Sequence, residues 1–180
     1  YNPQKVFSSI DQFGRYAFLN QPKITKWNLI RFAECLIPLF DSNEKKSIDL
    51  ASEIIDDFEN QYEIEQYRMM KCKLGLIDED KEDKEVISSL LNIMKTNKYD
   101  YTNTFCYLMD IKNFNFNKFE NLEFLKWKEK WTKRTISQKK KSLDLMRKSN
   151  PIIIPRNHLI EKILEMASND NFDQLNKFIK

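Results

Sequence analysis

The 180-residue chain is 41% hydrophobic, which is enough to bury the core of one ordinary domain and argues against intrinsic disorder. Its 30 basic and 27 acidic residues leave a net charge of +3, so composition gives no reason to expect a nucleic-acid partner or a membrane surface. No apolar run approaches the roughly 20 residues of a membrane-spanning helix, and we therefore expect no membrane insertion.

The first residues bear on whether the sequence is a fragment, and the cysteines bear on disulfide and zinc binding. The first residue is Tyr1 rather than Met, and residues 1–11 carry no targeting pattern, so we expect the natural start to lie upstream and the chain to be a fragment. Cys35, Cys72 and Cys106 are scattered and lack a CxxC spacing. This pattern favours core thiols over a disulfide scaffold or a zinc site.

The fold class follows from the scarcity of strand and turn signals. Only two glycines and five prolines occur, and alternating β-branched runs are almost absent, so the sequence predicts an all-α protein. Residues 1–13 lack a helical period and are predicted to form an ordered loop. The first long helix should begin near Pro22, with Asn20 or Gln21 at its cap. Few charges interrupt it as far as Phe40, which predicts a central helix buried on more than one side.

A second helix is predicted to open at Ser42 or Asn43 and to end at Gly75, because glycine takes the left-handed conformation without a Cβ clash. The acidic run at residues 77–84 is expected to be a solvated connector, since it lacks the glycine and spacing of a calcium loop. The remaining apolar periods predict helices at residues 86–94, 101–111 with Asp100 before it, 119–131, 137–148, 159–167 and 170–178.

Four shorter features favour structural roles. The NFNFN run at residues 113–117 alternates as a strand does, but it is short and flanked by predicted helices, so it is predicted to be a loop. His158 could serve as a general base, but the pattern favours a polar helix start with Asn157 as N-cap. Lys139–Lys141 is expected to be a solvated helix face rather than a nucleic-acid site. Asn150 and Pro151 should end the preceding helix.

Four strings in order along the chain resemble the selenoprotein O or YdiU-like family. The most specific is GRYAFLNQPKITKWNL at residues 14–29, and the others are KLGL at 73–76 with Phe58, Tyr62 and Met70 before it, DYTNTF at 100–105, and NPIIIPRNHLIE at 150–161. Tyr1-Asn2-Pro3 is similar to the segment that follows this family's metal-binding Asp-Tyr-Gly. Leu19 and Phe7 depart from the family's usual glycine and, in bacterial members, cysteine.

The resemblance implies a protein-kinase-like fold and transfer of AMP from ATP, with Mg or Mn, to Ser, Thr or Tyr hydroxyls of a protein substrate. It implies that this chain is the C-terminal half, with residues 1–21 as an activation-segment-like loop and turn and residues 22–180 as the helical C-lobe with a C-terminal helical extension. The catalytic, nucleotide-binding and metal-binding residues would lie upstream of Tyr1, in the other half of the same protein. Family members are cytoplasmic in bacteria and mitochondrial in eukaryotes, which leaves the compartment open.

No Gly-rich loop surrounds Gly14 or Gly75, so the chain is not expected to bind ATP or to transfer AMP by itself. Asp11, Arg15 and Tyr16 are the candidates for positioning the protein substrate. The alternatives are that Asp11 and Arg15 pair with each other or cap the helix, and that Tyr16 packs in the core.

The alternative function is a helical interaction module without catalysis, which would dock partners through Trp127 and Trp131 or through the first long helix. A third alternative is a kinase that transfers phosphate.

Overall fold

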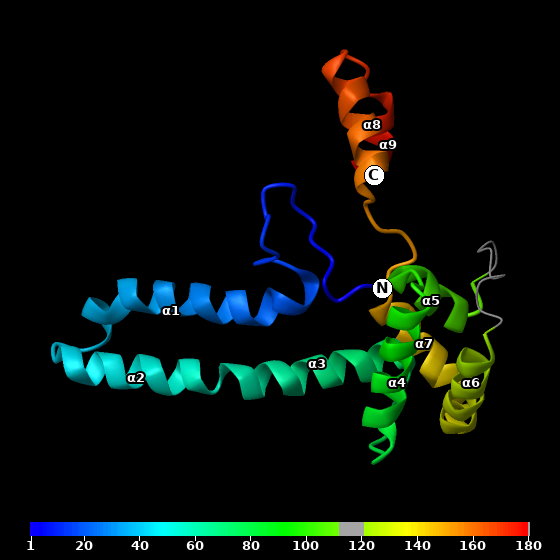
Figure 1. Cartoon of the computed structure of the whole chain (residues 1–180), viewed down its shortest axis with the longest axis horizontal. Coiled ribbons are helices and arrows are strands. Elements are labelled where there is room, and N and C mark those ends of the chain that lie inside the picture. Colours follow the sequence, from blue (N-terminus) through cyan, green and yellow to red (C-terminus); the bar gives the residue numbers. More distant parts are fainter. Residues whose placement is uncertain (112–120, 180) are drawn as a thin grey trace. The chain divides into compact units, whose positions relative to one another are not determined.

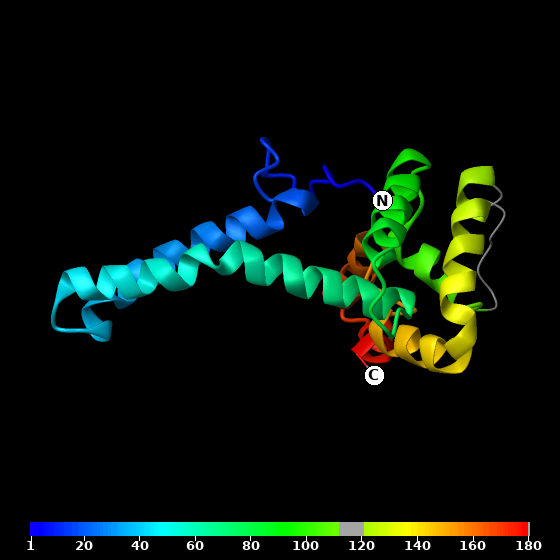
Figure 2. The same ribbon diagram turned by 90° about the horizontal axis from the view of Figure 1, so that it is seen from below.

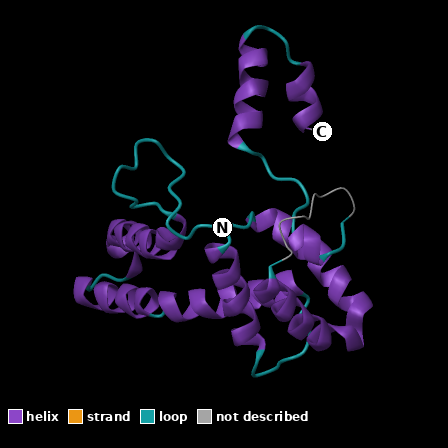
Figure 3. Cartoon of the chain, turned by 45° about the vertical axis from the view of Figure 1, so that its right-hand side comes forward, coloured by secondary structure: helices purple, strands orange, loops and turns teal. Residues whose placement is uncertain are grey.

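The computed structural model describes residues 1–111 and 121–179, and every regular element in these ranges is a helix (Figure 3). The chain divides into two compact units, Tyr1–Asn150 and Pro151–Lys180. The first unit contains α1 (Gln21–Phe40), α2 (Glu44–Asp56), α3 (Phe58–Leu74), α4 (Asp83–Thr96), α5 (Tyr101–Leu108), α6 (Leu122–Thr135) and α7 (Lys139–Ser149), with short 3₁₀ turns at η1 (Phe18–Asn20) and η2 (Ile136–Gln138). The all-α prediction is confirmed for the described residues.

Helix α1 begins where the sequence predicts, with Pro22 in its first turn, and runs beside α2 and the start of α3 (Figures 1 and 2). Asn20 stands at the cap position, but its side chain donates to the Gly14 carbonyl at 2.8 Å instead of capping the helix. The prediction that α1 is buried on more than one side is wrong for this chain. Of its 20 residues only Ile24 is buried, whereas Phe32 is 61% exposed.

The predicted second helix is two helices, α2 and α3, separated at Asp57. The Asn43 side chain caps α2 by accepting from the Lys46 N–H at 3.2 Å. Gly75 ends α3 as predicted, with φ 67° and its N–H donated to the Cys72 carbonyl. A Cβ at Gly75 would lie 2.8 Å from the Ser142 carbonyl oxygen, so glycine is required here both by conformation and by the close approach of α7.

The core of the first unit lies where the C-terminal part of α3 meets α4, α5, α6 and α7. Its fully buried side chains include Leu74, Leu90, Met94, Phe105, Phe124 and Met146. Trp127 and Trp131 stack with their ring planes 8° apart, and their indole N–H groups donate to the carbonyls of Val86 and Leu74, each at 2.8 Å. Both indoles are therefore core elements, and the alternative of a docking surface built on them is wrong.

The acidic connector is only partly solvated, which corrects the prediction for residues 77–84. Asp83 begins α4, and none of its surface is exposed. Its carboxylate accepts from Arg134 Nε at 2.9 Å and lies 3.6 Å from Lys71 Nζ. The Lys71 ammonium also pairs with Glu79 at 2.6 Å. The connector is thus held against α3 and α6 by a charged cluster.

The other predicted helices of this unit are present with small shifts. Asp100 caps α5 by accepting from the Asn103 N–H at 2.9 Å, and α5 ends at Leu108, before the predicted Ile111. Helix α7 ends at Ser149, directly before Asn150, as predicted, and Lys139–Lys141 are exposed on it. The NFNFN run at 113–117, and Phe119 at the predicted start of α6, lie outside the described residues. Of the three predicted core thiols, Cys106 is buried, Cys72 is half-buried and Cys35 is exposed.

The second unit is a pair of packed helices, α8 (Asn157–Ser168) and α9 (Asp173–Ile179). Arg156 occupies the N-cap position and Asn157 is the first helical residue, so the predicted cap is wrong by one position. Exposed His158 follows in the first turn. The last helix starts at Asp173 rather than Asp170, because Asp170 has φ 59° and forms the turn. No helix within the described residues is both long enough and apolar enough to cross a membrane.

Candidate functional site

The candidate site is the turn that precedes α1, and Asp11 shapes it. The two carboxylate oxygens of Asp11 accept the backbone N–H groups of Arg15 and Tyr16, at 2.9 and 2.8 Å. Gly14 supplies the left-handed residue of the turn with φ 69°. The alternative that Asp11 and Arg15 pair through their side chains is therefore wrong, because the Asp11 carboxylate accepts the backbone N–H of Arg15 and the two side chains form no ion pair. Asp11 fixes the turn through backbone donors.

The loop is tied to its own start by backbone hydrogen bonds. The N–H groups of Phe18 and Leu19 donate to the carbonyls of Lys5 and Pro3, at 3.0 and 2.8 Å. Ala17, which precedes Phe18, is buried. Residues 1–13 contain no helix, as predicted, and the irregular backbone continues to Ala17. The loop is thus an ordered platform that presents residues 11–16.

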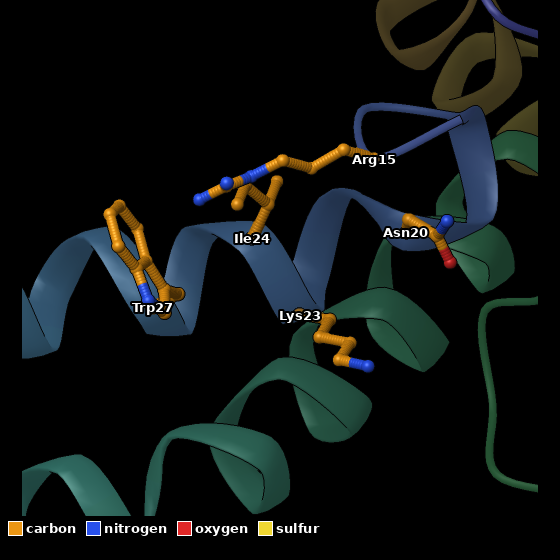
Figure 4. A pocket seen from close by; sticks show the side chains of 5 residues that line it. All are labelled: Arg15, Asn20, Lys23, Ile24 and Trp27. Atoms are coloured by element: carbon orange, nitrogen blue, oxygen red, sulfur yellow. The ribbon is translucent and has the colours of Figure 1, made fainter. Parts of the chain in front are cut away.

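Arg15 extends along α1 and stacks on an aromatic ring (Figure 4). Its guanidinium carbon lies 4.6 Å from the centroid of Trp27, and Arg31 approaches the same ring at 5.7 Å. A cation over an indole face is favoured by the ring quadrupole and leaves the N–H groups at the edge of the guanidinium available. Within the described residues, no carboxylate lies within ion-pair distance of Arg15, whereas Arg31 pairs with Glu34 at 2.6 Å.

A pocket of about 300 Å³ lies beside this stack. It is lined by Arg15, Asn20, Lys23, Ile24 and Trp27. Figure 4 shows Arg15 passing above Ile24 toward Trp27, while the Lys23 side chain points away from the Arg15 side chain. Cationic, amide and aromatic groups around one hollow are suited to a polar or anionic part of a peptide. Sequence reasoning missed Lys23 and Trp27, although the spacing of four residues from Lys23 to Trp27 places both near one side of a helix.

Tyr16 is 47% exposed, so the alternative that it packs in the core is wrong. Its carbonyl accepts from the Gln21 side chain at 2.6 Å, which joins the turn to the first residue of α1. The Tyr16 ring also lies 5.7 Å from the Arg15 guanidinium. Arg15 and Tyr16 together form a charged and aromatic edge of the loop.

Aromatic contacts join the loop to the core. The Tyr1 ring lies 5.8 Å from Phe18 and 5.7 Å from Tyr101, and Tyr101 lies 5.0 Å from Phe105. Burial raises the pKa of Tyr101 to about 12. The Lys73 ammonium lies 4.6 Å from the Phe105 ring, and burial lowers the pKa of Lys73. Three strings far apart in sequence, around residues 1–18, 73–76 and 100–105, therefore meet in one cluster.

The charged cluster at the connector, formed by Lys71, Glu79, Asp83 and Arg134, contains none of the residues predicted to be functional. Burial by itself would lower the pKa of Lys71, but the hydrogen bond that its ammonium donates to Glu79 and the charges of Glu79 and Asp83 raise the pKa. Burial likewise opposes the charge of Arg134, whose pKa is nevertheless raised by its hydrogen bond and charge interaction with Asp83. Each cation has a carboxylate partner, which is the pattern of a structural cluster.

The described residues form no cluster of metal-ligating side chains. Across residues 1–111 and 121–179, no group of three or more His, Cys, Asp or Glu side chains is arranged to hold a metal ion. Over the part of the chain that the structure describes, the protein is helical and presents an anchored loop with cationic and aromatic side chains.

Comparison with known proteins identifies the family. The family model described as "Protein adenylyltransferase SelO" matches residues 1–180 of this chain. The chain is 55% identical over 183 residues to the protein nucleotidyltransferase YdiU of Pelagibacter ubique, covering 100% of this chain and 38% of that protein. It is 45% identical over 174 residues to YdiU of Clostridium botulinum, covering 95% and 35%. The chain belongs to the SelO family of protein adenylyltransferases, and it spans little more than a third of the length of these relatives.

Proposed function

We propose that this chain is the C-terminal, substrate-facing portion of a protein adenylyltransferase that transfers AMP from ATP, with Mg or Mn, to Ser, Thr or Tyr hydroxyls of another protein. The observation that carries the proposal is the family match over the whole of residues 1–180. In this proposal the nucleotide and the metal are held by residues of the upstream half. Residues 22–180 correspond to the helical C-lobe of a protein-kinase-like fold with a helical extension.

Residues 1–21 act as an activation-segment-like loop that positions the protein substrate. Support comes from the loop's construction: Asp11 fixes the turn through two backbone N–H groups, and the Tyr1, Phe18 and Tyr101 rings anchor it to α5. An ordered loop holds its contact residues in place before substrate arrives, which lowers the entropy lost on binding. Arg15 and Tyr16 are the contact residues, and Asp11 is a positioning residue.

The test uses a whole-length chimera, in which residues 1–180 of this chain replace the matched 183 residues of the Pelagibacter ubique relative. The chimera is incubated with labelled ATP, Mg or Mn, and a mixture of proteins. Incorporation of labelled AMP into protein supports the proposal, and the isolated chain should give none. A folded chimera that incorporates no label with either metal would contradict it.

A non-catalytic interaction module is the second candidate, and exposed apolar residues of α1 favour it. Phe32 and Leu39 are 61% and 77% exposed on that helix. This alternative predicts that the chimera binds proteins without modifying them. A phosphorylating kinase would instead add phosphate, which is distinguished from AMP by the mass of the modified protein.

A further inference from the structure

Helix α1 carries a continuous apolar stripe that its neighbours leave exposed. Leu29, Phe32, Leu36, Leu39 and Phe40 define this stripe, which we call the outer stripe. Their spacing of three, four, three and one residues places them on one side of a helix. Leu36 is half-buried, and the other four are 38% to 77% exposed. The stripe runs for about 17 Å at 1.5 Å per residue.

The outer stripe is distinct from the face by which α1 packs on α2. Ile30, Ala33 and Ile37 face that neighbour, across a groove of about 420 Å³ that Ala51 and Ile55 of α2 also line. The helical period puts Ile30 and Ile37 roughly opposite Phe32 and Leu39. Helix α1 is therefore apolar on two sides, and α2 covers one of them.

The charges of α1 also avoid the outer stripe. Lys26 pairs with Glu59 of α3, and Arg31 pairs with Glu34 on α1 itself. By the helical period, neither of these cations nor Lys23 falls within the stripe. A charge-free apolar surface of this length on a helix is unfavourable in water and is typical of a surface that packs against another element.

We infer that the outer stripe packs against an apolar helix that the rest of the same protein supplies. The chain covers 38% of the Pelagibacter ubique relative and 35% of the Clostridium botulinum relative, so more than half of each relative's length is available to cover it. A straight apolar stripe is suited to a helix whose side chains pack between those of α1. The inference concerns packing within the whole protein and does not depend on adenylyl transfer.

Cysteine labelling tests the assignment in the chimera. Leu39→Cys is introduced into a Cys35→Ser background, because Cys35 is exposed on the same helix. The matched control is Ile136→Cys in the same background, at a position 63% exposed in η2. Maleimide labelling is followed at each cysteine by peptide mass spectrometry, in the isolated chain and in the chimera, and light scattering gives the mass of each protein in solution.

The expected result is that Leu39→Cys reacts at least about tenfold more slowly in the chimera than in the isolated monomeric chain, while Ile136→Cys changes by less than about threefold. Equal rates at Leu39→Cys in the two proteins, or equal slowing at both positions, would overturn the inference. Protection of Leu39→Cys in a dimer of the isolated chain would overturn it in favour of a second copy. Amide exchange over residues 29–40 in the unsubstituted proteins gives the same comparison without any substitution.

Discussion

The guanidinium of Arg15 lies 4.6 Å from the ring centroid of Trp27, so a residue of the loop is held against the first turns of α1. The contact joins the two ends of the GRYAFLNQPKITKWNL string, and it directs a cation toward the pocket beside α1. A flexible surface arginine would lose more side-chain entropy on binding a partner than one already stacked on an indole. The stack therefore preorganises the Arg15 side chain for the substrate contact that we propose for it.

Removal of the Arg15 side chain is expected to weaken protein-substrate binding. In the chimera, Arg15→Ala should raise KM for the protein substrate about tenfold with kcat nearly unchanged, because the lost interaction is made equally in the ground state and the transition state. The KM of Arg15→Lys should lie between that of the unsubstituted chimera and that of Arg15→Ala, since lysine keeps the charge but loses the planar stack. Steady-state kinetics of AMP transfer measures both constants. Arg68→Ala, an exposed arginine of α3, is the control and should change neither. A fall in kcat with unchanged KM would contradict the positioning role.

Alanine at the two glycines should have unequal effects on stability. Both residues have positive φ, 69° at Gly14 and 67° at Gly75, so each substitution carries a conformational cost of about 1 kcal/mol. At Gly75 the new Cβ would also lie 2.8 Å from the Ser142 carbonyl oxygen, whereas at Gly14 the nearest atom is 3.6 Å away. Gly75→Ala should therefore lower the free energy of unfolding by about 3 kcal/mol and Gly14→Ala by about 1 kcal/mol. Urea unfolding of the chain measures both, and equal losses would contradict the packing argument.

The Asp83 carboxylate should be essential for the stability of the connector. Asp83→Ala leaves the Arg134 guanidinium without its 2.9 Å partner and is expected to lower the free energy of unfolding by about 3 kcal/mol. The control is Asp144→Ala, which removes an exposed pair with Arg147 at 3.7 Å and should change stability by less than about 0.5 kcal/mol. Thermal or urea unfolding gives both values. If Asp83→Ala lowers the free energy of unfolding no more than Asp144→Ala does, the charged cluster does not contribute to stability.

Tyr101 should make stability depend on alkaline pH. Its pKa is raised to about 12 by burial, above its ordinary value of 10.0. Between these two values the unfolded chain releases the phenolic proton while the folded chain keeps it, so the contribution of this group to stability falls as pH rises from about 10 to 12, by at most about 1.4 kcal/mol per pH unit.

Tyr101→Phe should therefore flatten the fall in stability across this pH range. The ring contacts are retained, and the hydrogen bond from the phenol to Met70 Sδ is lost. Urea midpoints at several pH values measure the slope. Tyr62→Phe, at a more exposed position of α3, should leave the slope as in the unsubstituted chain. Identical slopes for Tyr101→Phe and the unsubstituted chain would contradict the burial argument.

Local sequence signals predicted what local physics decides. Pro22 starts α1, Gly75 stops α3 and Asp100 caps α5, because each effect depends on one residue's backbone preference or side chain. The break at Asp57 was missed because the apolar period continues across it from α2 into α3. The same signals made Arg15 a candidate for contacting the protein substrate, whereas its stack on Trp27 depends on where the folded loop lies.

Contacts between distant segments could not be read from the sequence. Asp83 looked like part of a solvated acidic run, and only its approach to Arg134, 51 residues later, makes it a buried partner. From the sequence alone, Trp127 and Trp131 could face either solvent or the core. The structure shows that they face the core, because their indole N–H groups donate to the Val86 and Leu74 carbonyls. The small number of charges in α1 predicted a helix buried on more than one side, whereas within this chain only Ile24 of that helix is buried.

The mass added to a protein substrate by the chimera tests the central claim most directly. The chimera is incubated with ATP, Mg or Mn and the protein that is labelled in the radiochemical assay, and intact-mass and peptide spectra locate the added group. The predicted result is one AMP on a Ser, Thr or Tyr hydroxyl, with none added by the isolated chain. A phosphate adduct, or an unmodified substrate with a folded chimera, would contradict the assignment.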